Sequence, residues 1–390
     1  MIVINDKRDC SGCYACVSIC PTSCISMNID EEGFWYPLVD MDKCIHCEAC
    51  IDVCHVINAY EPKNNPKAYA AYIRDDDIRK ESSSGGLFTL IAEEVLKEGG
   101  VVFGAVFDKN FDVHHDYIEK KEDLYKLRGS KYVHSKIGEN LIKAEEFLRQ
   151  GRKVLFTGTP CQVAGLRFYL LRDYDNLLTM DVICHGVPSP KVWDKYKKLV
   201  SKKNGDKIDN VSFRDKTKGW RNFSMMFDFK SKKRQLKTLD EDRYMYGFLR
   251  NIYLRPACHR CAEKSLNRKS DITFADYWGV ENVHKDFSDD KGIALVFTNT
   301  DRGKRAFEAI TDRIEYIETD MKRAASYNTA ATKNSVPNPR RKEFFKNIDS
   351  MDFEKLMDTY CQDSFSVRVK IKINGVIRKL KDIVKRIIRR

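Results

Sequence analysis

The chain has 390 residues and a formal net charge of +12, with 42% apolar and 11% aromatic residues. This length and composition can build a sizeable core and leave room for more than one domain. No stretch approaches the about 18 uninterrupted apolar residues of a membrane-spanning helix, and the first residues lack the features of a signal peptide. Fourteen cysteines without an export signal indicate a reducing interior in which thiolates bind metal. We therefore expect a cytoplasmic protein.

The first element along the chain is a repeated cysteine motif. Both copies have the spacing C-x2-C-x2-C-x3-C, at Cys10, Cys13, Cys16 and Cys20 and again at Cys44, Cys47, Cys50 and Cys54. This spacing is typical of bacterial-type ferredoxins with two 4Fe–4S clusters, in which the fourth cysteine of each run ligates the other cluster. We therefore predict a ferredoxin module over residues 1–60, with the ligand sets Cys10, Cys13, Cys16 and Cys54, and Cys44, Cys47, Cys50 and Cys20. Zinc binders, the alternative, usually space two CxxC pairs further apart.

Two positions in this module depart from the usual pattern. Pro21 follows the first run and fixes the turn there, whereas His55 stands after the second run, which predicts a looser turn. Cys24 is an additional cysteine, and because both clusters already have four ligands we interpret it as a small buried residue. Residues 33–39 are predicted to form hairpin and strand structure that shields the clusters from water.

After a polar linker at residues 61–66, helical and strand patterns alternate. Helices are predicted from a cap at Ser84 to Gly99, from Ile137 to Gly151 and from about Cys161 to Leu171, with strands over 101–107, 154–156 and 180–183. From about 208 to 300 strands dominate, at 211–214, 223–229, 271–274 and 293–298. The predicted fold is therefore α/β, becoming α+β in the second half, with a largely parallel sheet and functional loops after the strand ends.

Four further cysteines carry a second metal signal. Cys161 and Cys184 follow apolar strands directly, and Cys258 and Cys261 form a CxxC motif. Because neighbouring strand ends of a parallel sheet lie close together, the first two could converge with the later pair. Four thiolates suit either a third 4Fe–4S cluster or a tetrahedral zinc ion, and the ferredoxin module upstream favours iron–sulfur. Cys361 stands alone and is interpreted as structural.

Several small polar motifs could hold a phosphate group. The segment Ser82–Gly86 opens a helix whose free N–H groups favour an anion, but taken alone it is interpreted as a flexible helix cap. The segment 128–132 adds positive charge and an aromatic ring, and the segment 156–160 adds a small-residue turn from strand to helix. His185 and His259, beside proposed ligands, are interpreted as ordinary loop histidines, with cluster tuning as the alternative. For residues 276–278, flavin contact and simple packing are both open.

Five segments in order resemble the beta-subunit family of coenzyme F420-reducing hydrogenases and dehydrogenases: SSSGGLFTLIAEEVLKEGGVVFGAVFD, RGSKYVHS, LFTGTPCQVAGL, ICHGVPSP and RPACHRCAEKSLNRKSDITFADYWGV. The resemblance implies a domain that binds FAD and a 4Fe–4S cluster, with a flavin-binding part over 66–150 and a C-terminal part with the third cluster over 151–330. It implies that the third cluster is ligated by Cys161, Cys184, Cys258 and Cys261. It also places near the FAD the residues Ser84, Gly85, Gly86, Lys131, Gly158 and Thr159.

The C-terminal tail concentrates the positive charge. Residues 368–390 hold ten basic residues and one acid, which leaves a net +3 for residues 1–367. Apolar residues recur there at helical spacing, so we predict a basic amphipathic helix. Such a helix can contact the inner face of an anionic membrane or an acidic partner, and packing on the protein's own core is the alternative.

Together these features predict a FAD- and iron–sulfur-dependent oxidoreductase with three 4Fe–4S clusters. FAD takes or gives a hydride and passes single electrons to clusters, which would form a wire to a redox partner protein or to a diffusible carrier such as coenzyme F420 or ferredoxin. The alternative is an electron-delivery subunit without substrate chemistry of its own. A third interpretation makes the large domain a zinc-stabilised scaffold. Nucleic-acid binding is not expected, because no basic and aromatic patch is evident. No motif identifies the substrate.

Overall fold

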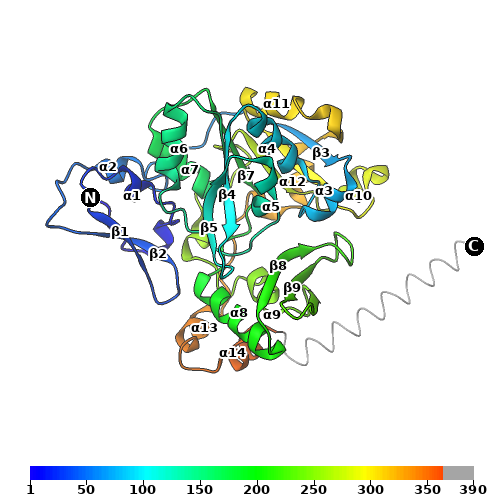
Figure 1. Cartoon of the computed structure of the whole chain (residues 1–390). Helices are drawn as coiled ribbons and strands as arrows, with labels where there is room; N and C mark the ends of the chain where they lie inside the picture. Colours follow the sequence, from blue (N-terminus) through cyan, green and yellow to red (C-terminus); the bar gives the residue numbers. More distant parts are fainter. Residues whose placement is uncertain (363–390) are drawn as a thin grey trace, which may run out of the picture.

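A computed structural model describes residues 1–362, and the tail predicted at 368–390 lies outside the described residues. Figure 1 shows the N-terminal cysteine module (blue) at one side of a larger α/β body. The elements of the module are η1 (Lys7–Asp9), α1 (Ala15–Ile19), β1 (Ile25–Ile29), β2 (Trp35–Val39) and α2 (Ala49–Asp52). β1 and β2 pair as an antiparallel hairpin with Ile25 opposite Val39, as predicted for this segment.

The body is built on a large sheet formed by β3 (Lys67–Ile73), β4 (Val101–Phe107), β5 (Val113–Ile118), β6 (Val154–Gly158), β7 (Leu177–Val182), β11 (Ile272–Asp276), β12 (Ala294–Thr298) and β13 (Ile314–Thr319). The spatial order is β13-β3-β12-β11-β7-β6-β4-β5. The central strands β4, β6, β7 and β11 are parallel, whereas β5 and β12 run antiparallel to their neighbours. The α/β class is confirmed, and the sheet is more mixed than the sequence predicted.

Helices cover both faces of this sheet, because successive strand side chains point to opposite sides. On one face, α4 (Leu87–Lys97) and α11 (Asp301–Glu308) pack on residues such as Val102, Leu155 and Met180. On the other face, α6 (Asn140–Arg149) and α7 (Pro160–Leu170) pack on Phe103 and Phe156. The second core also takes in Tyr14 of the N-terminal module. The module is therefore packed on the α6–α7 face.

The predicted helix after residue 84 is present, but the predicted cap is wrong. Gly86, not Ser84, is the N-cap residue, and it has the left-handed φ of +85° with no side-chain cap. Ser84 instead donates its hydroxyl hydrogen to the carbonyl oxygen of Ile293. A left-handed residue at the helix start is easiest for glycine, which explains why the serine is displaced from the cap position.

A smaller antiparallel sheet of β8 (Ile208–Asp215), β9 (Ser224–Phe229) and β10 (Arg234–Thr238) lies beside the body. It shares a core with α8 (Pro190–Asn204), α9 (Arg243–Leu249), α13 (Arg341–Asn347) and α14 (Phe353–Tyr360). The remaining elements are α3 (Asp76–Glu81), η2 (Lys121–Asp123), α5 (Leu124–Leu127), η3 (Pro256–Arg260), α10 (Val280–Val283), η4 (Lys285–Phe287), η5 (Thr311–Arg313), α12 (Met321–Ser326) and η6 (Thr329–Ala331).

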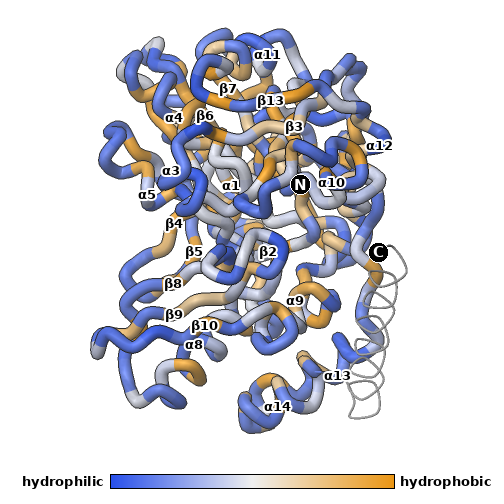
Figure 2. Tube along the Cα trace, turned by 90° about the vertical axis from the view of Figure 1, so that its right-hand side faces the viewer, coloured by the Kyte–Doolittle hydropathy of each residue, from blue (hydrophilic) through white to orange (hydrophobic). Residues whose placement is uncertain are grey.

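Hydropathy follows this arrangement. Figure 2 shows hydrophobic segments (orange) along strands of the large sheet and hydrophilic segments (blue) along many outer loops. Within residues 1–362, no helix combines the length and the apolar character that crossing a membrane requires.

The loops after β6, β7 and β11 leave the same edge of the sheet, since these strands are parallel neighbours. In open α/β sheets, ligands bind beyond this carboxyl edge.

Candidate functional site

The twelve predicted ligand cysteines line three pockets, and each pocket gathers one of the predicted ligand sets. The inner pocket of the N-terminal module is lined by Cys10, Cys13, Cys16 and Cys54. The outer pocket of the same module is lined by Cys20, Cys44, Cys47 and Cys50. The third pocket, at the carboxyl edge of the large sheet, is lined by Cys161, Cys184, Cys258 and Cys261. The structure thus brings these thiols together as the sequence grouped them, and their ligation of clusters stays a prediction.

The two cysteine runs fold in the same way. The residue after the second cysteine of each run, Tyr14 or Glu48, has a left-handed backbone, with φ of 68° and 63° respectively. A short helix follows at once and carries the third cysteine of the run, Cys16 in α1 and Cys50 in α2. This tight loop turns three thiols of one run toward a common space, and the fourth comes from the other run.

The outer pocket contains a fifth thiol. Cys24 is 6% exposed, in agreement with its predicted burial, and its Sγ lies 3.3 Å from the Sγ of Cys20. Cys47 on the other side of this pocket is exposed to solvent. The outer pocket therefore reaches the surface of the protein at Cys47.

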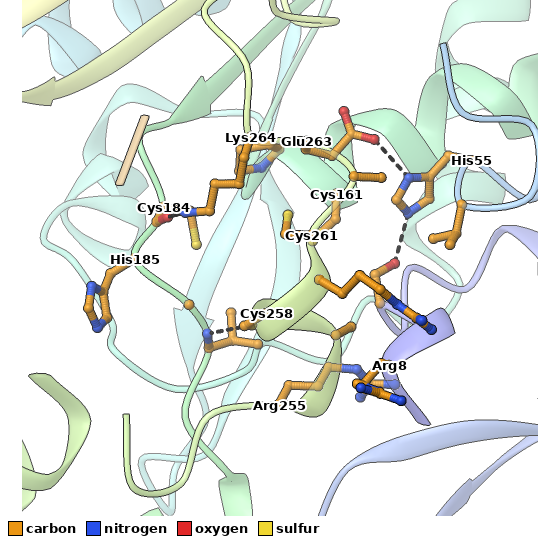
Figure 3. Close-up of a pocket in the computed structure, with 18 of the residues that line it drawn as sticks. Arg8, His55, Cys161, Cys184, His185, Arg255, Cys258, Cys261, Glu263 and Lys264 are labelled. Atoms are coloured by element: carbon orange, nitrogen blue, oxygen red, sulfur yellow. Dashed lines mark hydrogen bonds and ion pairs between the residues drawn. The ribbon is translucent and has the colours of Figure 1, made fainter. Parts of the chain in front are cut away.

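Three parts of the body build the third pocket (Figure 3). β6 ends at Gly158, and Thr159 caps α7 through a capping box with Gln162, which places Cys161 in the first turn of the helix. Cys184 follows the neighbouring parallel strand β7. Cys258 lies in η3, and Cys261 directly follows that short helix. The predicted convergence of strand ends is what the structure shows.

The lining of the third pocket is cationic. Five basic residues contribute to it, namely Arg8, Arg255, Arg260, Lys264 and Arg268, against the single carboxylate of Glu263. The empty space is about 630 Å³, counting the part open to solvent. Burial raises the pKa of the Cys258 thiol to about 12, and burial also raises the pKa of Cys161 and Cys184. These thiols would become thiolates only with a strong cation such as iron beside them.

The donor set of the third pocket suits a metal group with several irons. A cubane takes one thiolate at each of four irons and carries negative charge, which the cationic lining would balance. The binding of a cluster here, and not of zinc, stays a prediction.

The inner and third pockets adjoin, because Ser11, His55 and Val56 line both. His55 is 1% exposed, its Nε2 lies 2.8 Å from the Ser11 hydroxyl, and its Nδ1 lies 2.9 Å from a carboxylate oxygen of Glu263. Lys269 donates to the other carboxylate oxygen at 2.7 Å. Burial alone would lower the pKa of His55, but hydrogen bonds to Cys13 and Glu263 raise it to about 10. The turn predicted to be looser is therefore firmly held.

The predicted flavin residues lie at the same sheet edge, but packing accounts for several of them. A Cβ on Gly85 would lie 2.4 Å from the carbonyl oxygen of Ala71, so the glycine permits close approach to β3. Ser83, beside Ser84, accepts a hydrogen bond at 2.7 Å from the backbone N–H of Ser130, which joins this loop to the segment that contains Lys131. Gly158 and Thr159 serve the α7 capping box. Contact of these residues with FAD stays a prediction.

Lys131 has surroundings that packing does not explain. Its amine donates to the carbonyl oxygens of Arg128 at 3.0 Å and Gly129 at 3.2 Å, and no carboxylate of the described residues lies within 4 Å of it. Burial lowers the pKa of Lys131 to about 7. This half-buried amine is held by carbonyl dipoles and lies 5.5 Å from the centroid of the Phe107 ring, so an anionic ligand beside it would supply the full opposite charge that these groups lack.

Sequence reasoning missed a second group of cations near the Ser82–Gly86 loop. Arg214 forms a two-pronged ion pair with Asp276 and donates at 3.1 Å to the carbonyl oxygen of Ser83. Lys216 donates at 3.1 Å to the carbonyl oxygen of Ser84, and burial lowers its pKa to about 7. These residues come from β8 and the turn after it, more than 130 positions from the loop they contact, and no local motif marks them.

The residues left open by the sequence have ordinary structural roles. His185 shares a 2.7 Å hydrogen bond with Asn251, and His259 lies 2.7 Å from the carbonyl oxygen of Ser335. Burial lowers the pKa of both histidines. Trp278 stacks on Trp220 with ring centroids 4.8 Å apart. These contacts favour the simpler interpretation of loop histidines and packed aromatic rings.

Family models match the two parts of the chain. The model for the C terminus of the coenzyme F420 hydrogenase/dehydrogenase beta subunit matches residues 151–323, and the model for its N-terminal part matches residues 68–141. These two matches cover more than half of the chain. A 4Fe–4S dicluster domain model matches residues 9–58.

Individual relatives are more distant. An uncharacterised protein of Methanocaldococcus jannaschii is 26% identical over 242 residues, which are 52% of this chain and 65% of that protein. A coenzyme F420-dependent sulfite reductase of the same organism is 29% identical over 238 residues, which are 55% of this chain and 36% of that enzyme. The chain therefore spans less than two-thirds of either relative. A chain of the F420-reducing NiFe hydrogenase complex from Methanosarcina barkeri has a TM-score of 0.46 at 20% identity, covering 72% of this chain and 98% of that one.

Proposed function

Because the chain belongs to the coenzyme F420 hydrogenase/dehydrogenase beta-subunit family and carries a 4Fe–4S dicluster domain, we propose that it is a FAD- and iron–sulfur-dependent oxidoreductase. It would pass electrons between a flavin, three 4Fe–4S clusters and an external substrate or redox partner. The general function, iron–sulfur electron transfer of the kind associated with F420-linked beta subunits, follows from the family. The flavin, the third cluster and the partner are the parts proposed here.

The observation that carries the proposal is the order of the three cysteine pockets. The outer and inner pockets share one small core that includes Cys16, Cys20, Cys50 and Cys54. The inner and third pockets share lining residues, and the third pocket lies at the ligand-binding edge of the sheet. Clusters in these pockets would form a path for electrons from the exposed Cys47 to the carboxyl edge of the large sheet.

The flavin is proposed to bind along the same edge. Bound there, FAD would convert between hydride and single-electron transfer. The amines of Lys131 and Lys216 lie beside the loops 128–131 and 82–86, where they would neutralise the charge of its diphosphate. Arg214, fixed by Asp276, would hold the Ser83 carbonyl in place and so keep the loop shaped for the ligand.

A second candidate function is electron delivery to a partner enzyme, and the N-terminal module favours it. Residues 1–60 contain nine acidic and three basic residues, although the whole chain carries +12. A module with a net negative charge is suited to a basic protein partner, because complementary charge steers encounter. In this case the protein would need that partner for any turnover.

Anaerobic reduction of the purified protein separates the two functions. The protein alone is mixed with reduced coenzyme F420, with NADH or with reduced ferredoxin, and the flavin absorbance is followed. Bleaching by reduced coenzyme F420 or NADH supports the oxidoreductase. Bleaching by reduced ferredoxin, but by neither of these hydride donors, supports electron delivery. A protein that purifies without flavin and cannot be reconstituted with FAD contradicts the proposal.

A further inference from the structure

Arg255 is a buried arginine that joins the third pocket to the inner pocket. Its side chain is 1% exposed, and the residue immediately precedes η3, the short helix that carries Cys258. Its backbone N–H donates to Val187 at 2.9 Å, and its carbonyl oxygen accepts from the N–H of Cys258 at 2.9 Å. The backbone of Arg255 is therefore part of the wall of the third pocket.

The side chain of Arg255 extends into the N-terminal module. Its Nε donates to the carbonyl oxygen of Cys10 at 2.8 Å, and its Nη2 donates to the carbonyl oxygen of Trp35 at 2.8 Å. The same Nη2 lies 3.6 Å from the Sγ of Cys10. A Cβ on Gly12 would lie 3.1 Å from the guanidinium carbon, so the cysteine loop is shaped to receive this group.

The charge of this guanidinium has no carboxylate to balance it. Within residues 1–362, no acidic oxygen lies within 4 Å of an Arg255 nitrogen, and Nη1 has no hydrogen-bond partner. A buried cation without a counter-charge is strongly unfavourable. The rings of Tyr36 and Phe34, with centroids 4.3 and 5.5 Å from the guanidinium carbon, present partially negative faces to it. Full negative charge would come from the cysteine thiolates of a bound cluster, beginning with Cys10.

We propose that Arg255 sets the reduction potential of the inner cluster and thereby directs electrons toward the third pocket. The inference rests on the proposed iron–sulfur function. When one electron passes from the outer to the inner cluster, the outer cluster is oxidised, the inner cluster gains one negative charge, and no bond or proton is exchanged. The fixed cation stabilises this added charge. Among the described residues, no lysine or arginine lines the outer pocket or donates to one of its cysteines, so the outer cluster lacks a cation like the Arg255 guanidinium, whose Nη2 lies 3.6 Å from the Sγ of Cys10.

The test is a potentiometric titration of the anaerobic protein followed by electron paramagnetic resonance. Arg255→Gln removes the charge and Arg255→Lys keeps it, while both lose part of the hydrogen-bond geometry. We expect Arg255→Gln to lower the equilibrium constant for electron passage from outer to inner cluster about tenfold, which is about 59 mV for a one-electron couple. In Arg255→Lys, the reduction potential of the inner cluster should stay close to the wild-type value.

Arg341→Gln is the matched control. Arg341 also holds the module, through Glu32, but its charge is already paired and it contacts no cysteine. Its loss should leave the inner potential unchanged. Equal potentials in Arg255→Gln and Arg255→Lys, or an unchanged potential in Arg255→Gln, would overturn the inference.

A measurement on the wild type covers the case in which Arg255→Gln does not retain its iron. The two N-terminal clusters are then titrated in the unmodified protein, with Cys47→Ser used to assign the outer signal. The inner cluster should have the higher potential, and equal or reversed potentials refute the role of Arg255. Absence of any reduced-cluster signal in the wild type would instead count against the proposed function.

Discussion

Lys131 and Lys216 are the residues whose protonation would change most when an anion binds beside them. Both amines are bonded to backbone carbonyls near the loops at 82–86 and 127–131, and burial lowers the pKa of each to about 7. An anion beside them would restore the charged form and so raise these pKa values. Flavin binding should therefore take up protons near neutral pH.

The pH dependence of flavin affinity tests this linkage. Below pH 7 the Lys131 ammonium is charged before binding, and above pH 7 it must be protonated on binding, so the affinity should fall as the pH rises. We expect the flavin affinity to fall by up to about tenfold per pH unit for each coupled amine. In Lys131→Arg, where the side chain stays charged, one proton fewer should be taken up on binding, so the affinity should depend less steeply on pH. Lys131→Met should weaken flavin binding at pH 6. An unchanged slope in Lys131→Arg would contradict the assignment.

The outer pocket makes a prediction about its fifth thiol. Cys20 and Cys24 have Sγ atoms 3.3 Å apart, yet only Cys20 belongs to the repeated motif. Cys20→Ser should lose about four iron atoms per chain, the content of one cubane, while Cys24→Ser should keep them. Iron and sulfide analysis of the two purified variants checks this. Equal iron loss in both variants would show that Cys24 ligates the cluster.

At the scale of elements, α7 connects two cysteine sites. Its first turn carries Cys161 of the third pocket, and its middle packs against α1 of the N-terminal module. Gly165 lies at that contact, where a Cβ would be 2.6 Å from the Cβ of Cys13. One helix therefore fixes the position of the inner pocket relative to the third.

Gly165→Ala should consequently destabilise the protein, although alanine is the better helix former. The overpacking cost of about 1–3 kcal/mol should exceed the gain of about 1 kcal/mol in helix propensity. Anaerobic thermal unfolding and iron content are the measurements. Leu171→Gly at the end of the same helix is the control, because Leu171 is 69% exposed with a left-handed φ of 56°, and glycine should be tolerated there. A Gly165→Ala variant as stable as the wild type would show that the contact adapts.

The elements also show what sequence reasoning can and cannot supply. The spacing of apolar residues predicted α4, α6, α7 and the central strands, because the buried face of a helix or strand leaves a regular pattern in the local sequence. The antiparallel edges of the sheet depend on pairing between distant strands and were not predictable from local pattern. The same holds for single contacts: Arg255 bonds to Cys10 across 245 positions, and His55 bonds to Glu263 across 208. The cysteines of the N-terminal module could be grouped because they recur at short, regular spacing, whereas the four cysteines of the third pocket were grouped from the ends of neighbouring strands and from the family resemblance.

At the scale of the whole molecule, the three pockets define a direction from the module surface to the sheet edge. Cys47→Ser should impair the outer cluster, where Cys47 is exposed. Electron uptake from reduced ferredoxin should then fall far more than flavin reduction by a small hydride donor, because the hydride donor reaches the flavin directly. Stopped-flow reduction with each donor measures the ratio. Equal losses with both donors would contradict this path.

The central claim is that one chain holds three clusters and a flavin. The most direct measurement is anaerobic purification followed by quantification of iron, acid-labile sulfide, zinc and flavin per chain. The account predicts about twelve iron atoms, four for each cubane, and about one FAD. About eight iron atoms with about one zinc and no flavin would contradict it, and would leave a ferredoxin module fused to a zinc-stabilised scaffold.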